Sequence, residues 1–196
     1  MTPPTTPGLS PSQTVGPFFL DSLLREDARR NVLVEPQTQG ERIRIEGLVL
    51  DGDGAPVPDA LIEIWQANAF GRYRHPSDTR DLPLDPAFTG FGRSGTDAAG
   101  RFWFETIRPG AEPYDRQRMQ APHICVLVFA RGLLNHLATR LYFDDEPVNA
   151  DDPVLLLVPA DRRHTLLARR DVADGRLVYR FDIILQGEGE TAFFDQ

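Results

Sequence analysis

The sequence predicts an all-β protein folded as a two-layer β-sandwich, with short helices and an extended N-terminal arm. Short segments in which apolar and polar residues alternate recur along the chain, as expected of half-buried strands. The 16 Gly and 17 Pro residues indicate many turns between these segments. Only one long segment, late in the chain, has the pattern of a helix. Many short strands with a single helix are typical of a β-sandwich.

Composition limits the function classes. A chain of 196 residues favours one domain, and the formal charge of −8 argues against nucleic-acid binding, which needs a basic face. The single cysteine excludes an internal disulfide and indicates a reducing compartment. No apolar run approaches the ~20 residues of a membrane span, and no secretory signal is evident at the N-terminus. We therefore expect a soluble cytoplasmic protein.

The first residues differ in composition from the rest. Residues 1–13 are rich in Pro, Thr and Ser, which by itself favours a disordered tail. Residues 14–19, with two adjacent aromatic residues, are a segment that would dock on a core or a neighbour. We divide the chain into an arm, residues 1–19, and a single domain, residues 20–196. Leucines early in the domain, at 20, 23 and 24, predict a short helical turn.

The first half of the domain predicts three strands, each with alternating polarity and each bounded by a turn. Asp-Gly-Asp-Gly at 51–54 is a turn after the first strand, and residues 95–100 form a turn before the third. The predicted strands are Arg42–Leu50, Leu61–Gln66 and Arg101–Ile107.

The stretch 121–145 brings candidate metal ligands onto a strand. An apolar run at 125–129 predicts one strand, and residues 140–143 predict a second. Side chains alternate faces along a strand, so His123 and Cys125 lie on the same face. A metal centre built on a strand would use two ligands at this spacing.

Three further elements are predicted towards the C-terminus. Residues 154–158 are predicted to form a short buried run, and residues 176–185 a final strand. Residues 161–169 predict the one substantial helix, with Asp161 as N-cap and arginines near its C-terminal end.

Five stretches carry a likeness to a known family: VPDALIEIWQANAFGRYRH (57–75), TDAAGRFWFETIRPG (96–110), APHI (121–124), RLYFDDE (140–146) and YRFDIILQGEGETAFFD (179–195). Together they resemble the intradiol ring-cleavage dioxygenases, and more narrowly the protocatechuate 3,4-dioxygenase group. The resemblance implies a sandwich of the prealbumin/Ig-like type. It also implies a non-haem Fe(3+) ion held by two tyrosinates and two histidines, ligands that suit a hard cation.

The resemblance assigns ligand positions residue by residue. Tyr73, in Gly-Arg-Tyr-Arg-His, stands at the first tyrosinate position. Tyr114, in a shorter loop, is the counterpart of the second. His123 matches the first histidine, whereas the second histidine position holds Cys125.

Two more departures accompany Cys125. An arginine that the resemblance places three residues before the first histidine is Gln120 here, and a glutamine near the iron is Arg140. Three polar residues that the resemblance implies are thus replaced within one small site, at Gln120, Cys125 and Arg140. We therefore predict that the four ligand positions are vestigial, and that this chain alone binds no metal and holds no catalytic residue.

Other motifs are similar to the non-metal α chain of the protocatechuate 3,4-dioxygenase group: SQTVGPFF, MQAPHI, FARG, TRLYFDDE and QGEGETAFF. The resemblance implies a homologous β subunit as partner. The β subunit would bind the Fe(3+), and the complex would cleave protocatechuate with O2 between its two hydroxylated carbons to give 3-carboxy-cis,cis-muconate. This chain would supply scaffold, interface and part of the partner's substrate pocket. The residues implied there are Thr14, Gly16, Pro17 and Arg131.

Two other hypotheses remain open. The chain could be a stand-alone intradiol dioxygenase with Tyr73, Tyr114, His123 and Cys125 as iron ligands. It could instead be a non-enzymatic, transthyretin-like binding module, because strands of the VPDALIEI type also occur there. A neighbouring gene for a homologous chain with an intact His-x-His motif would favour the subunit hypothesis.

Overall fold

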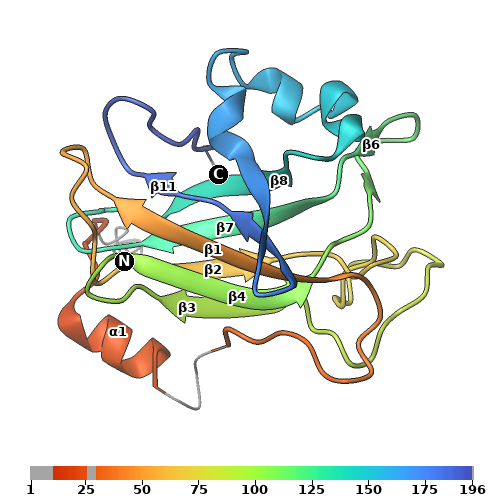
Figure 1. Cartoon of the computed structure of the whole chain (residues 1–196), viewed down its shortest axis with the longest axis horizontal. Coiled ribbons are helices and arrows are strands. Elements are labelled where there is room, and N and C mark those ends of the chain that lie inside the picture. Colours follow the sequence, from red (N-terminus) through yellow and green to blue (C-terminus); the bar gives the residue numbers. More distant parts are fainter. Residues whose placement is uncertain (1–10, 26–29, 196) are drawn as a thin grey trace, which may run out of the picture.

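The computed structural model describes residues 11–25 and 30–195, and its strands form two packed layers (Figure 1). One layer contains β1 (Arg42–Leu50), β4 (Arg101–Ile107), β9 (Leu167–Ala173), β10 (Arg176–Arg180) and β11 (Ile183–Ile184). The other contains β2 (Leu61–Trp65), β3 (Phe91–Gly95), β7 (His123–Phe129) and β8 (Leu137–Phe143). The predicted two-layer β-sandwich is confirmed.

Hydrogen bonds join the two layers at one edge. β8 pairs in parallel with β9, where Tyr142 lies opposite Leu167 and Phe143 opposite Ala168. The strand order is therefore continuous, β11-β1-β10-β9-β8-β7-β2-β3, with β4 on the free side of β1. On its other side β8 pairs antiparallel with β7, which places residues 123 and 125 in register with residues 142 and 140.

The core lies between the layers and is built by alternation. In β1, Ile43, Ile45 and Val49 point inward, whereas Arg44 and Glu46 lie on the outer face. The other strands contribute to the same core in the same way, with Ile62, Ile64, Phe102, Phe104, Ile124, Val126 and Val128. Burying one such side chain contributes about 1.5–3 kcal/mol, so the alternating pattern determines which face of each strand packs inward.

The predicted last strand is interrupted. β10 ends at Arg180 and β11 begins at Ile183, although both pair in parallel with β1 in the same register. The carbonyl oxygen of Phe181 lies only 1.8 Å from the position that a Cβ on Gly47 would take. Glycine is therefore required at position 47, where the backbone of Phe181 approaches β1 closely.

The predicted helix at residues 161–169 is wrong. A 3-10 helix, η3 (Arg163–Leu166), occupies its first part, and Leu167 already begins β9. No side chain caps η3, so Asp161 does not act as an N-cap. β9 bonds to β10 and to β8, and these strand pairings outweigh the local helical pattern.

Short elements complete the structure. The predicted early helical turn is α1 (Pro17–Leu23), which crosses the expected boundary at residue 19. The 154–158 run forms a 3-10 helix, η2 (Leu155–Leu157), and only partly matches the buried run expected, because Leu157 is 74% exposed. The remaining elements are β5 (Glu112–Pro113), β6 (Met119–Gln120) and η1 (Pro147–Asp151).

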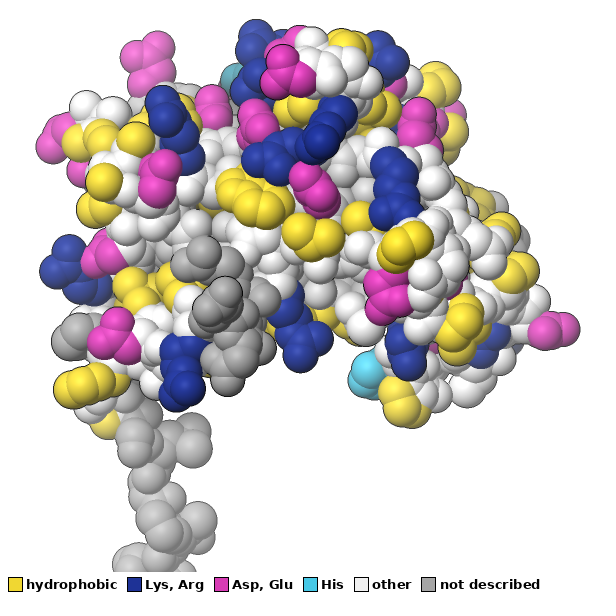
Figure 2. Space-filling view, turned by 60° about the horizontal axis from the view of Figure 1, so that its bottom comes forward, with side chains coloured by type: hydrophobic (Ala, Val, Ile, Leu, Met, Phe, Trp, Pro, Cys, Tyr) yellow, Lys and Arg dark blue, Asp and Glu magenta, His cyan; other side chains and the backbone are white. Residues whose placement is uncertain are grey.

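The surface carries mixed charge. Figure 2 shows basic and acidic side chains interspersed over one face, with hydrophobic side chains in small groups. In the part of the chain that the structure describes, no helix is long and apolar enough to cross a membrane.

Candidate functional site

Tyr73, at the first tyrosinate position that the family resemblance implies, lies in the loop that follows β2. Its ring stacks on Trp65 with centroids 5.6 Å apart and an interplanar angle of 19°. Its hydroxyl donates a hydrogen bond to Glu112 Oε1 at 2.8 Å. Burial, and next the negative charge of Glu112, raise the pKa of Tyr73 far above its usual value. The phenol is therefore held in its protonated form.

His123 opens strand β7 and is 2% exposed. Its Nδ1 lies 2.8 Å from the carbonyl oxygen of Ala121. Because a carbonyl oxygen can only accept, Nδ1 carries the proton, and Nε2 is the ring nitrogen left for other partners. Burial, and next the positive charge of Arg140, lower the pKa of His123 to about 4. The imidazole is neutral at neutral pH.

Glu112, on β5, joins these two side chains, and it is not among the residues predicted for the site. The same oxygen that accepts from Tyr73, Oε1, lies 3.3 Å from His123 Nε2. Burial raises the pKa of Glu112, and the Tyr73 hydrogen bond and then Arg140 act against this rise. Oε1 of Glu112 is therefore the common neighbour of the Tyr73 hydroxyl and of His123 Nε2. Glu112 is one of 29 Asp and Glu residues, and nothing in the sequence distinguishes it from the others.

The three predicted departures from the family pattern do lie close together. Cys125 is half-buried in β7 and stands opposite Arg140 of β8. Arg140 donates to Gln120 Oε1 at 2.7 Å, and its Nη1 lies 3.4 Å from the Tyr142 hydroxyl. Burial raises the pKa of the Cys125 thiol, although the charge of Arg140 acts against this. We refer to Tyr73, Glu112, Gln120, His123, Cys125 and Arg140 as the polar cluster.

Tyr114 lies outside the polar cluster. It follows β5 in the hairpin that β5 and β6 form, and it is 44% exposed. Its ring packs against the guanidinium of Arg118 at 4.7 Å. The structure therefore brings together three of the four ligand positions that the family resemblance implies and leaves the fourth at the surface.

The polar cluster does not fit the ferric ion that the family resemblance implies. A metal ligand must be deprotonated, whereas the Tyr73 hydroxyl donates a hydrogen bond to Glu112. A half-buried thiol stands in place of the second imidazole, and the charged Arg140 faces it. Within residues 11–25 and 30–195, no group of three or more His, Cys, Asp or Glu is arranged to hold a metal ion.

A second set of predicted residues meets at the other end of β7. Thr14 Oγ1 accepts a hydrogen bond from the backbone N–H of Gly132 at 2.7 Å. Gly132 adopts a φ of +89° in the turn after β7, a conformation that favours glycine. The neighbouring Arg131 is 68% exposed and pairs with Asp59. We refer to Thr14, Asp59, Arg131 and Gly132 as the arm patch.

Gly16 and Pro17 link the arm patch to α1. Gly16 is the N-cap residue and Pro17 begins the helix, where its missing N–H costs nothing. Gly16 has a φ of −93°, and no atom lies within 4 Å of the position that a Cβ would take. This chain itself therefore does not require glycine there. The Phe19 ring contacts Phe129 at 5.6 Å and holds α1 against the end of β7.

β7 separates the two sets. His123 is its first residue and Phe129 its last, a span of roughly 20 Å at about 3.3 Å per residue. Figure 1 shows the β5–β6 hairpin at one end of the sandwich and α1 towards the other. The polar cluster and the arm patch are thus separate sites of this chain.

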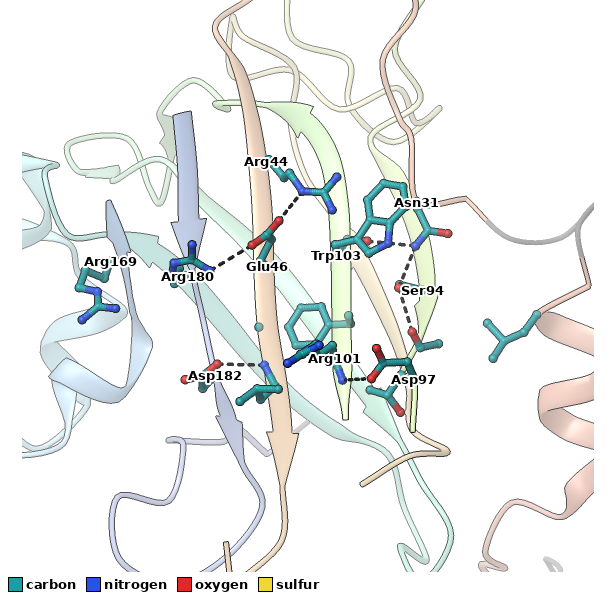
Figure 3. A pocket seen from close by; sticks show the side chains of 16 residues that line it. Asn31, Arg44, Glu46, Ser94, Asp97, Arg101, Trp103, Arg169, Arg180 and Asp182 are labelled. Carbon is teal, nitrogen blue, oxygen red and sulfur yellow. Dashed lines mark hydrogen bonds and ion pairs between the residues drawn. The ribbon is translucent and has the colours of Figure 1, made fainter. Parts of the chain in front are cut away.

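The described residues also line two cavities, one that borders the polar cluster and one that lies apart from both sets. A shallow one of about 390 Å³ adjoins Tyr73 and is lined by Trp65, Tyr73, His75, Ser77, Asp78, Thr79 and Arg80. A larger one, of about 770 Å³, lies on the outer face of β1 and β4, and no sequence motif predicts it (Figure 3). In the larger cavity, Glu46 accepts from Arg44 at 2.6 Å and from Arg180 at 3.1 Å. This carboxylate is already paired inside the chain.

Comparison with known proteins gives a consistent result. A family model described as "Dioxygenase" matches residues 15–187. The chain is 46% identical to a protocatechuate 3,4-dioxygenase alpha chain of Burkholderia cepacia, over 97% of this chain and 99% of that one. It is 41% identical to the beta chain from the same organism, over 86% of this chain and 74% of that one. Among solved structures, the dioxygenase domain of a carbohydrate-binding fusion protein from Streptomyces sp. SirexAA-E is 28% identical, with a TM-score of 0.63 over 93% of this chain and all of that one.

Proposed function

This chain belongs to the intradiol ring-cleavage dioxygenase family, and we propose that it is the α subunit of a protocatechuate 3,4-dioxygenase whose β subunit is a homologous chain. The observation that carries the proposal is the polar cluster, where Glu112 bonds the two side chains that would otherwise face iron. The 46% identity over nearly the full length of both chains supports the α assignment over the β assignment.

The proposal divides the work between the two subunits. The family uses non-haem iron, and we assign the Fe(3+) to the β subunit. Ring cleavage of protocatechuate by O2, between its two hydroxylated carbons, then occurs in the β subunit and yields 3-carboxy-cis,cis-muconate. This chain supplies scaffold, interface and one wall of the substrate pocket. We place the complex in the cytoplasm, because a single cysteine suits a reducing compartment.

The arm patch is the part of this chain that we assign to the substrate pocket. Arg131 is exposed and carries a fixed positive charge, which suits the carboxylate of protocatechuate. Its present partner is Asp59, and an exposed ion pair of this kind contributes only about 0–1 kcal/mol. A substrate carboxylate can therefore replace Asp59 at low cost.

Residues of the arm complete this wall. Thr14 ties the arm to the turn beside Arg131 through its bond to Gly132. Pro17 limits the conformations that the arm loses on docking. At Gly16 the open space around the missing Cβ leaves room for close approach by another chain.

Co-expression with the homologous β chain from the same genome tests the proposal. We expect the two chains to co-purify, to carry iron with a tyrosinate-to-iron absorption band, and to consume protocatechuate. The chain expressed alone should show neither iron nor ring cleavage. Stoichiometric iron and ring cleavage in the isolated chain would favour the stand-alone dioxygenase. Failure to associate with the β chain, without any activity, would favour a binding module.

A further inference from the structure

Glu112 contacts the two side chains at the vestigial ligand positions through the atoms that a metal would need. The Tyr73 hydroxyl oxygen lies 2.8 Å from Glu112 Oε1, and His123 Nε2 lies 3.3 Å from the same oxygen. Because Nδ1 of His123 is engaged by Ala121, Nε2 is the only ring nitrogen able to bind a metal. One carboxyl oxygen thus occupies the shared position of both ligand atoms.

We propose that Glu112 keeps metal out of this site: its carboxyl group replaces the ion as the common partner of Tyr73 and His123, so that restoring the second histidine at Cys125 does not restore metal binding. The inference rests on the proposed function only in treating Tyr73, His123 and Cys125 as ligand positions. It goes further, because it assigns metal exclusion to a residue that the family pattern does not mark.

The geometry explains why displacement of Glu112 is costly. Its side chain is 12% exposed and His123 is 2% exposed, so neither can turn outward to water without opening the site. β5 and β6 pair at Glu112–Gln120 and Pro113–Met119, which anchors Glu112 beside β7. If a metal displaced the carboxyl group, it would leave a buried polar group without a partner.

The guanidinium of Arg140 also supplies a positive charge beside the site, as a metal ion would. Arg140 lies opposite Cys125 and bonds to Gln120, the residue that pairs with Glu112 in the β5–β6 hairpin. A half-buried guanidinium beside the site compensates a carboxylate and repels an added cation. Glu112 thus occupies the position that the ion would take, and Arg140 provides the positive charge that the ion would provide.

Four variants of the full chain test this inference: Cys125→His, Glu112→Ala, and the double variants Cys125→His/Glu112→Ala and Cys125→His/Glu112→Gln. Each is incubated with Fe(3+) and separately with Co(2+), desalted and assayed for bound metal. The tyrosinate-to-iron band and the Co(2+) visible bands report direct ligation. We expect the Ala double variant to bind metal at least about tenfold more tightly than Cys125→His, with a thermal midpoint that metal raises.

The Gln double variant separates occupancy from charge. Glutamine has the shape of glutamate, so we expect this variant to remain closed to metal. Metal loading by this variant, or equal loading by Cys125→His alone, would overturn the inference. Iron bound by the wild-type chain and lost in Glu112→Ala would also overturn it, because Glu112 would then be a ligand. The inference would also be overturned if Cys125→His/Glu112→Ala folded but bound no metal.

Controls keep the result interpretable. Cys125→His/Glu63→Ala removes another partly buried carboxylate, one that pairs with Arg93 outside the polar cluster, and should bind no metal. If a variant is unstable alone, the assay is repeated in the complex with the β chain, where a newly formed site appears as a second metal ion per pair. Association with the β chain is measured for every variant, so failure of the subunit assignment is seen independently of metal binding.

Discussion

At the His123 end of β7, polar side chains are buried and bond to one another, whereas at the Phe129 end they are exposed and make few contacts within the chain. In the polar cluster, Glu112 serves both Tyr73 and His123. In the arm patch, Arg131 is 68% exposed and has one ion pair. The difference indicates that the first region is closed to ligands and the second is available to a partner or substrate.

The free-energy cost of breaking polar contacts also differs between the polar cluster and the arm patch. Breaking a network of buried polar groups leaves unsatisfied partners and costs about 1–3 kcal/mol per group. Breaking an exposed ion pair costs about 0–1 kcal/mol. Substitutions in the polar cluster should therefore change the stability of this chain, and substitutions in the arm patch should change the function of the complex.

The largest effect is expected for Arg140→Met. The change removes the donor to Gln120 and the charge that compensates Glu112, while it keeps most of the side-chain volume. We expect the free energy of unfolding to fall by about 3 kcal/mol, measured by urea denaturation. Arg118→Met is the control: Arg118 is 58% exposed and pairs with Asp115, so the loss should stay below about 0.5 kcal/mol. Equal losses would show that the polar cluster is not a coupled network.

The pH dependence of stability tests the burial of His123. Its pKa is about 4 in the folded chain and 6.5 in an unfolded chain, so the unfolded chain binds more protons between these values. Stability is then fully present above pH 6.5 and is lost as the pH falls towards 4. The raised pKa of Glu112 acts in the opposite direction, so we expect a net loss smaller than the roughly 3 kcal/mol that the His123 shift alone would give.

His123→Gln isolates this contribution, because glutamine does not titrate. Urea denaturation at several pH values should show a smaller loss between pH 6.5 and 4 in the variant than in the wild type. Identical slopes for the two proteins would mean that His123 is not held neutral by its surroundings.

A functional effect is expected for Arg131→Ala in the assembled complex. Loss of the positive charge should raise the KM for protocatechuate about fivefold, with iron content and the stability of the chain unchanged. The penalty should shrink as salt is added, since exposed charges are screened. Arg176→Ala is the matched control, because Arg176 is 70% exposed and pairs with Glu105. An unchanged KM at low salt would exclude a substrate role for Arg131.

The smallest effect is expected for Thr14→Val. Valine has the shape of threonine but cannot accept the hydrogen bond from Gly132. We expect a rise in KM of about twofold in the complex, because the arm is held less firmly beside Arg131, at a cost of about 0.5 kcal/mol. Thr14→Ser keeps the acceptor and should match the wild type. If both variants behave alike, the hydrogen bond does not position the arm.

Local pattern was sufficient for much of the fold. The strands Arg42–Leu50 and Arg101–Ile107 were predicted with the bounds that the structure gives, because alternation along a strand is written in neighbouring residues. The same reasoning placed His123 and Cys125 on one strand, and the departures Gln120 and Arg140 do lie beside them.

Tertiary structure decided what depends on distant partners. Residues 167–173 form a strand rather than the end of a helix because β8 and β10 bond to them from both sides. Tyr114 is at the surface, and Glu112, from the same hairpin, occupies the position between Tyr73 and His123. Tyr73 is 39 positions from Glu112 in the chain, and His123 is 11 positions from it. No periodicity reports such a contact, because it forms only when the loop after β2, the β5–β6 hairpin and β7 are packed together.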